Sequence, residues 1–65
     1  MIKYIAKKEL MDEDWKTQLA KGYENIPQGA ECQFIKSIHN FYGNYALVEY
    51  NNCTYYVNPQ DLEKV

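Results

Sequence analysis

The sequence contains no arginine and a single histidine, and it has no long apolar run. Without arginine the chain lacks the side chain that makes bidentate contacts to guanine and phosphate, and a net charge of −2 weighs against a basic surface. We therefore do not expect a nucleic-acid partner. No run approaches the roughly 20 apolar residues of a membrane span, so we expect no membrane segment.

Cysteine is also scarce. Cys32 and Cys53 lack a Cys-x-x-Cys partner, and with His39 alone between them they do not have the spacing of a zinc site. His39 has no carboxylate or cysteine nearby in the sequence with which to activate a nucleophile. The sequence therefore predicts no enzyme, no metal site and no cofactor.

We also expect no secretory signal, because the first eight residues are charged throughout and have no apolar core. We therefore expect a cytoplasmic protein. Because disulfides are rare in reducing compartments, we expect both cysteines to be free thiols, of which Cys53 is the more exposed. The lack of arginine, with abundant asparagine, lysine, tyrosine and isoleucine, is typical of AT-rich genomes. We interpret the chain as a protein of bacterial or phage type.

What is present suits one small folded domain. The 65 residues are 46% hydrophobic and 15% aromatic, which is enough apolar material for a compact core. We expect a single domain over 1–65, mainly β in class.

The first third of the chain predicts a strand and then a helix. Alternation of apolar and polar residues indicates a strand at about 2–8. A short helix is expected at 11–22, with Asp12 as its N-cap and Gly22 at its C-terminal end. Its apolar residues recur every four positions: Met11, Trp15 and Leu19. This amphipathic helix needs a surface on which to dock.

Turn residues separate the elements that follow. Pro27 and Gly29 mark a turn before a strand at about 30–38, and a loop is expected at 39–44. Asn51-Asn52 then tolerates the positive φ angles of a two-residue hairpin turn. The expected hairpin pairs on its core face are Tyr50 with Cys53, Val48 with Tyr55, and Ala46 with Val57. One turn of helix and a short closing strand end the chain.

The opposite face of that hairpin carries Tyr45, Leu47 and Tyr56, with Leu47 directly across from Tyr56. Three large side chains on an outer face need a cover. One interpretation is a partner-binding patch, since tyrosine is enriched at interfaces. The other is that the helix stripe of Trp15 docks on them.

From Pro27 onward the chain resembles an SH3-like small β-barrel. The resemblance rests on the Pro27–Ile35 turn and strand, the Tyr45–Val57 meander and the ending Tyr55–Val65. It implies about five strands, with one helix inserted after the first strand and a 3-10 turn before the last.

The resemblance also places candidate binding residues. Tyr45 falls where SH3 domains hold the tryptophan that grips a proline-rich ligand, and Tyr56 falls near one of their binding tyrosines. Asn58 stands at the position of their binding-surface proline, and Asp61 at that of their last tyrosine. The full proline-peptide motif is therefore absent.

Two further features are open to two interpretations each. Phe41 and Tyr42, at a predicted loop tip, either anchor a partner or fold back over the barrel. The acidic residues Glu9, Asp12, Glu13 and Asp14 are interpreted as helix capping and solvation; the alternative is attraction of a basic partner or imitation of a nucleic-acid backbone.

We therefore expect a small non-enzymatic binding module that engages another protein, as an accessory or inhibitory factor. The expected partner-binding residues are Tyr45, Tyr56, Leu47, Phe41 and Tyr42. A symmetric homodimer is a further expectation for an exposed aromatic patch. The alternative function is a nucleic-acid-associated small β-barrel.

Overall fold

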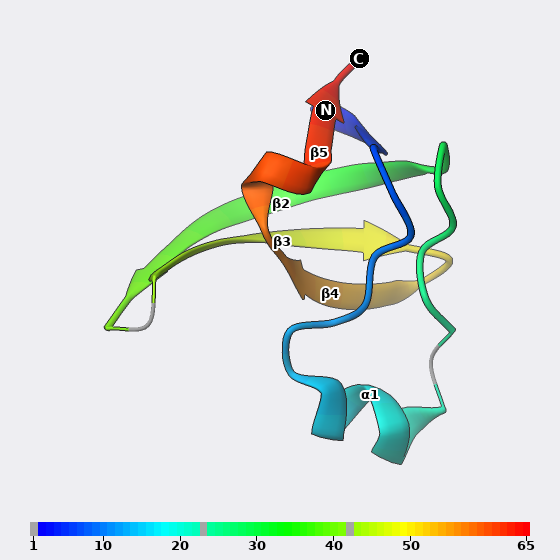
Figure 1. Ribbon diagram of the computed structural model, residues 1–65, viewed down its shortest axis with the longest axis vertical. Helices are drawn as coiled ribbons and strands as arrows, with labels where there is room; N and C mark the ends of the chain where they lie inside the picture. Colours follow the sequence, from blue (N-terminus) through cyan, green and yellow to red (C-terminus); the bar gives the residue numbers. More distant parts are fainter. Residues whose placement is uncertain (1, 23, 42) are drawn as a thin grey trace.

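The computed structural model describes residues 2–22, 24–41 and 43–65, which form one antiparallel sheet with a short helix and a 3-10 turn (Figure 1). The elements in chain order are β1 (Lys3–Ala6), α1 (Trp15–Lys21), β2 (Glu31–Asn40), β3 (Gly43–Tyr50), β4 (Cys53–Val57), η1 (Pro59–Asp61) and β5 (Leu62–Lys64). The mainly β prediction is confirmed, including the helix after the first strand and the 3-10 turn before the last.

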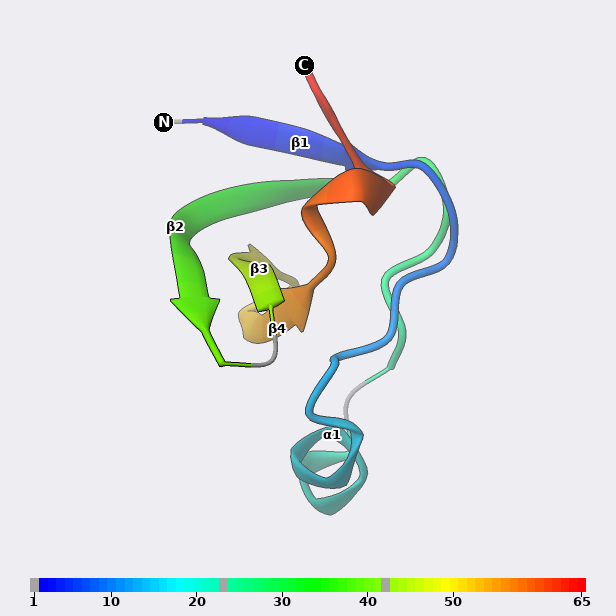
Figure 2. The same cartoon turned by 60° about the vertical axis from the view of Figure 1, so that its left-hand side comes forward.

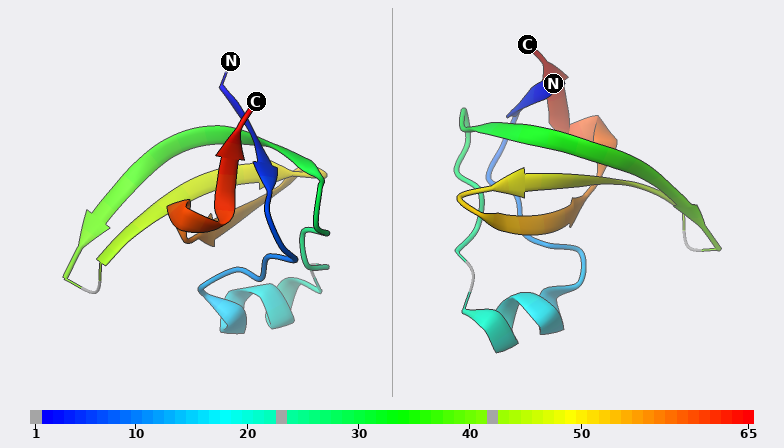
Figure 3. Two further views of the ribbon diagram at one scale, coloured as in Figure 1. Left: turned by 45° about the horizontal axis from the view of Figure 1, so that its top comes forward. Right: turned by 180° about the vertical axis from the view of Figure 1, so that it is seen from behind.

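The five strands lie side by side in the order β4-β3-β2-β1-β5. Strands β4 and β5 are thus the two edges, and no pairing among the described residues joins them. The sheet curves strongly, as the two views of Figure 3 show, but it is not closed into a barrel. The sequence predicted a small barrel, whereas the observed strand pairing forms an open, curved sheet.

The β3–β4 hairpin has the predicted register. Its pairs include Tyr50 with Cys53 and Val48 with Tyr55. The turn residues Asn51 and Asn52 have φ angles of 52° and 65°. Both angles are positive because a two-residue turn must match the right-handed twist of its strands. Local turn chemistry and alternation were therefore sufficient to predict this element.

One face of the sheet forms the core. Its buried residues come from all five strands and from the long connection between β1 and β2: Ala6, Leu10, Ile26, Cys32, Ala46, Val48, Tyr55, Val57 and Leu62. Aromatic rings close the core at its margins, where Tyr4 meets Phe34 edge to face with centroids 5.6 Å apart. The buried hydroxyl of Tyr55 donates a hydrogen bond to the Glu24 carbonyl at 2.6 Å.

The loop predicted at 39–44 is wrong. His39 pairs with Asn44, and Asn40 pairs with Gly43, so β2 and β3 run on to a tight turn that contains Phe41. This part of the hairpin projects beyond the other strands as an arm (Figure 1). The arm has no core to cover, so its strands can carry polar residues. Such residues are typical of loops, which is why the sequence predicted a loop here.

The connection over residues 7–30, here called the excursion, leaves the sheet and returns to it. Backbone hydrogen bonds of 2.8 Å in both directions join Leu10 and Ile26 at its base. Helix α1 lies at its far end, away from the sheet (Figure 2).

The predicted helix start was wrong. Helix α1 begins at Trp15 with Asp14 as its N-cap residue, because the Asp12 carboxylate is used elsewhere. The predicted end is confirmed, since Gly22 takes the left-handed conformation with φ 71°.

Two of the three residues of the predicted apolar helix stripe are exposed. Met11 precedes α1 and is 56% exposed, and Leu19 is 71% exposed. The side chain of Trp15 lies outside the described features. Among the α1 residues whose side chains the structure describes, Gln18 turns inward and is only 6% exposed. A polar side chain therefore helps to hold α1, and the spacing of apolar residues did not predict its burial.

Candidate functional site

Alternation along the hairpin places the candidate aromatic residues on the outer face of the sheet. Ala46 and Val48 of β3 are buried in the core, so Tyr45 and Leu47 face the other way. Leu47 pairs with Tyr56 of β4, as predicted. Tyr56 is 40% exposed, and Tyr45 and Leu47 are half-buried.

Strand β2 adds Ile38 to this surface, which the sequence did not indicate. Strict alternation from the buried Cys32 would turn Ile38 toward the core. A β-bulge between Phe34 and Lys36 shifts the register by one residue, so that Ile38 pairs with Tyr45 and shares its face. A bulge has no reliable sequence signal, and pattern alone could not have found this residue.

The segment of the excursion just before α1 forms the other wall of the site. The amide of Glu13 donates to the Tyr56 carbonyl at 2.7 Å, and the amide of Tyr56 donates to Asp12 Oδ1 at 3.2 Å. The amide of Asp14 donates to the same Asp12 oxygen at 2.9 Å. Residues 12–14 are thereby attached to the free edge of β4, which places Glu13 and Asp14 beside Tyr56.

Between these walls is an open hollow of about 580 Å³, lined by Glu13, Asp14, Ile38, Asn40, Tyr45 and Tyr56. We call it the groove. Tyr45 and Glu13 also line a neighbouring hollow of about 540 Å³ that extends to Pro59 of η1. Apolar and aromatic side chains and two acidic residues therefore line the same hollow. Asp14 is the N-cap residue of α1, although its side chain makes no capping hydrogen bond, and the side chains of Glu13 and Asp14 are both exposed.

The structure brings together only part of the predicted set. Tyr45 and Tyr56 line the groove, and Leu47 lies next to Tyr56 in the sheet. Phe41 lies at the tip of the arm with 97% of its surface exposed, and it does not line the groove. Tyr42 is outside the described residues. Met11 and Leu19 of the expected helix stripe do not line the groove either.

His39, Cys32 and Cys53 are side chains that can act as a base or a nucleophile. His39 is exposed on the arm, where its Nδ1 is 2.5 Å from Asn44 Oδ1. Both cysteines are free, and Cys32 is the more buried of the two. Burial raises the pKa of the Cys32 thiol, whose hydrogen points at the Tyr4 carbonyl 3.6 Å away. A thiol in this state is a weak nucleophile.

Within residues 2–22, 24–41 and 43–65 there is no group of three or more histidine, cysteine, aspartate or glutamate residues placed to hold a metal ion. No helix in that part of the chain is both long and apolar enough to span a membrane.

Comparison with known proteins identifies no relatives: no protein-family model, curated protein or solved structure matches the chain.

Proposed function

We propose that this protein is a small non-enzymatic binding module that engages another protein through the groove, with Tyr45 and Tyr56 as the central contacts. The observation that carries the proposal is the pairing of a partly exposed aromatic surface with a carboxylate wall fixed by backbone hydrogen bonds. A preorganised surface loses little entropy on binding. Leu47 and the arm residues Phe41 and Tyr42 extend the contact surface.

We further propose that the module is SH3-like. The support is the order of its elements: a long excursion after β1, the β2–β3–β4 meander, and η1 between β4 and the short β5. In this arrangement Tyr45 lies near the start of β3 and on its outer face. This is the position where the resemblance expects an aromatic binding residue.

The proposed ligand is not a polyproline segment. Asn58 occupies the position of the expected proline, and its Oδ1 accepts the Gln60 amide at 2.9 Å to cap η1. Asp61 occupies the position of the expected tyrosine and lies 3.7 Å from Lys8 Nζ. Both residues stabilise the local fold and leave no aromatic clamp for a second proline.

The groove instead suits an apolar side chain with a lysine or arginine beside it. Tyr45, Tyr56 and Ile38 offer the apolar contact, and the carboxylates of Glu13 and Asp14 attract a cation. The same carboxylates repel phosphate, which favours a protein partner over the nucleic-acid alternative. Function as an accessory or inhibitory factor is consistent with a module that binds and does not catalyse.

Quantitative capture tests the proposal. Immobilised wild-type protein, Tyr45→Ser and Tyr56→Ser are exposed to the same extract of the source cells, and the bound proteins are counted by mass spectrometry. We expect the specific partner to fall by about tenfold or more with either variant, as for central interface aromatics. Phe41→Ala measures the contribution of the arm tip separately.

The matched control is Thr54→Ala, which changes an exposed residue on the same strand as Tyr56 but outside the groove. Circular dichroism of each variant shows that the sheet is retained. Equal capture by the wild type and both tyrosine variants would contradict the groove as the binding surface.

A further inference from the structure

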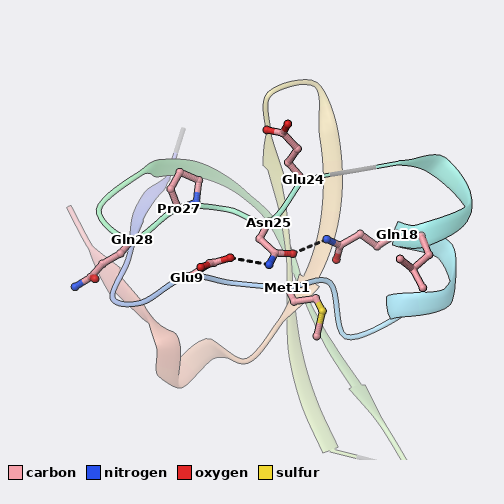
Figure 4. A pocket seen from close by; sticks show the side chains of 8 residues that line it. Glu9, Met11, Gln18, Glu24, Asn25, Pro27 and Gln28 are labelled. Carbon is pink, nitrogen blue, oxygen red and sulfur yellow. Dashed lines mark hydrogen bonds between the residues drawn. The ribbon is translucent and has the colours of Figure 1, made fainter.

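A second hollow lies next to the Leu10–Ile26 bridge at the base of the excursion. Both bridge residues are buried in the core. Side chains alternate along extended backbone, so the residues on either side of Leu10 and Ile26 point away from the core. These outward residues are Glu9, Met11, Asn25 and Pro27, and all four line the hollow (Figure 4).

Helix α1 forms the opposite wall of this hollow through Gln18 and Leu19. Gln18 Nε2 donates to Asn25 Oδ1 at 2.6 Å, and Asn25 Nδ2 donates to Glu9 Oε2 at 2.7 Å (Figure 4). Gln18 Oε1 accepts the Asp12 amide at 2.7 Å. The side-chain amides of Gln18 and Asn25 thus already have hydrogen-bond partners within the protein. These bonds hold the wall in place, and an incoming ligand need not replace them.

The hollow presents apolar surface that the fold leaves uncovered. Its volume is about 810 Å³, and none of the described residues that line it also lines the groove. Met11 and Leu19 are 56% and 71% exposed. A methionine thioether adapts its shape to different partners, which suits a docking surface better than a rigid side chain does.

The charge of the hollow indicates what it accepts. Among the described residues that line it, the charged ones are both glutamates, Glu9 and Glu24, and none is a lysine. The backbone at Glu24 is held by the core residue Tyr55, whose hydroxyl donates a hydrogen bond to the Glu24 carbonyl. Two carboxylates at the rim of an apolar surface complement a lysine or arginine that follows or precedes an apolar side chain.

We propose that this hollow, here called the α1 hollow, is a second docking surface, and that its occupant is a basic protein segment with one apolar anchor residue. The anchor contacts Met11, Leu19 and Pro27, and flanking lysine or arginine side chains pair with Glu9 and Glu24. The protein then has two binding surfaces with different described lining residues, and one chain can connect two partner segments.

Nuclear magnetic resonance with a defined probe tests this proposal. The ¹⁵N-labelled protein is titrated with a short peptide that has one leucine flanked by lysines, and separately with the same peptide carrying glutamates instead. We expect saturable shifts of the amides at 9–11, 18–19 and 24–28 with the lysine peptide, and none with the glutamate peptide.

Two charge-reversal variants separate local recognition from general attraction. Glu24→Lys and Glu63→Lys change the net charge equally and replace exposed side chains, but only Glu24 lines the α1 hollow. We expect Glu24→Lys to weaken the peptide by about fivefold and Glu63→Lys to change it by less than about twofold. Leu19→Lys, at an exposed helical position, should abolish the shifts.

Three results would overturn the proposal. One is the absence of shifts at Met11 and Leu19 with millimolar lysine peptide. Another is a set of shifts confined to Tyr45 and Tyr56, which would support the groove while removing the α1 hollow. The third is the appearance of the same shifts when the protein alone is concentrated, because the occupant would then be a second copy of this chain.

Discussion

At the scale of single residues, Asp12 joins two parts of the molecule. Its side chain is 3% exposed, and its Oδ1 accepts the amides of both Asp14 and Tyr56. Edge strands carry unpaired backbone groups that attract other strands. Asp12 covers one such group at β4 and at the same time holds the carboxylate wall of the groove next to Tyr56.

Tyr55 gives the first prediction at this scale. It is 2% exposed, and its hydroxyl holds the Glu24 carbonyl at 2.6 Å. Tyr55→Phe removes this partly buried hydrogen bond, so we expect the free energy of unfolding in urea to fall by about 1 kcal/mol. Tyr56→Phe, at a residue 40% exposed, should change it by less than about 0.5 kcal/mol. Equal losses would show that the hydroxyl contact is not what distinguishes Tyr55.

The two thiols give a second prediction. Burial raises the pKa of Cys32, and Cys53 is half-buried beside the hairpin turn. Because only the thiolate attacks, iodoacetamide at neutral pH should modify Cys53 first and Cys32 only when the protein unfolds. Mass spectrometry of wild type and Cys53→Ser measures both rates, and fast modification of Cys32 in the folded variant would contradict the prediction.

The same pKa shift has a consequence for stability. The folded pKa of Cys32 lies above its unfolded value. Its contribution to stability is therefore fully present at neutral pH, below the unfolded pKa, and is lost as the pH rises through the folded pKa.

At the scale of elements, the β3–β4 hairpin and the excursion are built differently. The hairpin buries alternate apolar residues and follows local rules. The excursion is joined at its base by the Leu10–Ile26 bridge and at its far end by the amide contacts of Gln18 and Asn25. Polar contacts depend on where distant residues lie, which is why the start of α1 was predicted wrongly and the burial of Gln18 was not predicted, while Gly22 was predicted correctly.

The hairpin turn supplies the prediction at this scale. Asn52 has φ 65°, a conformation that glycine adopts without steric strain. We expect Asn52→Gly to raise the free energy of unfolding by about 0.5 kcal/mol and Asn52→Ala to lower it by about 1 kcal/mol. The measurement is thermal unfolding followed by circular dichroism.

Asn40→Gly is the control, because Asn40 lies in β2 and does not have a positive φ. There glycine should destabilise by about 0.5–1 kcal/mol. The same sign of change at both sites would mean that the turn conformation does not decide the effect.

At the scale of the whole molecule, acidic residues accompany both proposed binding surfaces. Glu13 and Asp14 line the groove, and Glu9 and Glu24 line the α1 hollow, although the net charge of the chain is only −2. Both hollows therefore combine acidic residues with apolar or aromatic side chains. This arrangement favours basic partners and opposes binding to phosphate.

The same arrangement bears on self-association. A two-fold dimer through the groove would bring Glu13 and Asp14 of one copy close to those of the other. In place of the symmetric homodimer that the aromatic patch alone suggested, we therefore expect the protein to remain a monomer, and light scattering from micromolar to millimolar concentration should give a constant mass. A mass that doubles, and that returns to the monomer value in Tyr56→Ser, would instead show that the groove is a dimer interface.

The sequence by itself determined the features that depend on neighbours along the chain. Alternation and the Asn51-Asn52 pair predicted the hairpin register, its core face and the outward Tyr45, Leu47 and Tyr56. The order of the last elements, η1 and then β5, followed from the same local patterns.

Only the tertiary structure decided what lies against that outer face. The bulge after Phe34 turned Ile38 outward, and Asp12 used its carboxylate on Tyr56 instead of capping the helix. Glu13 and Asp14 consequently became a wall of the groove, while Met11 and Leu19 came to line a separate hollow. The physical reason is that a buried carboxylate and a shifted register are satisfied by partners far away in the chain, which no local pattern encodes.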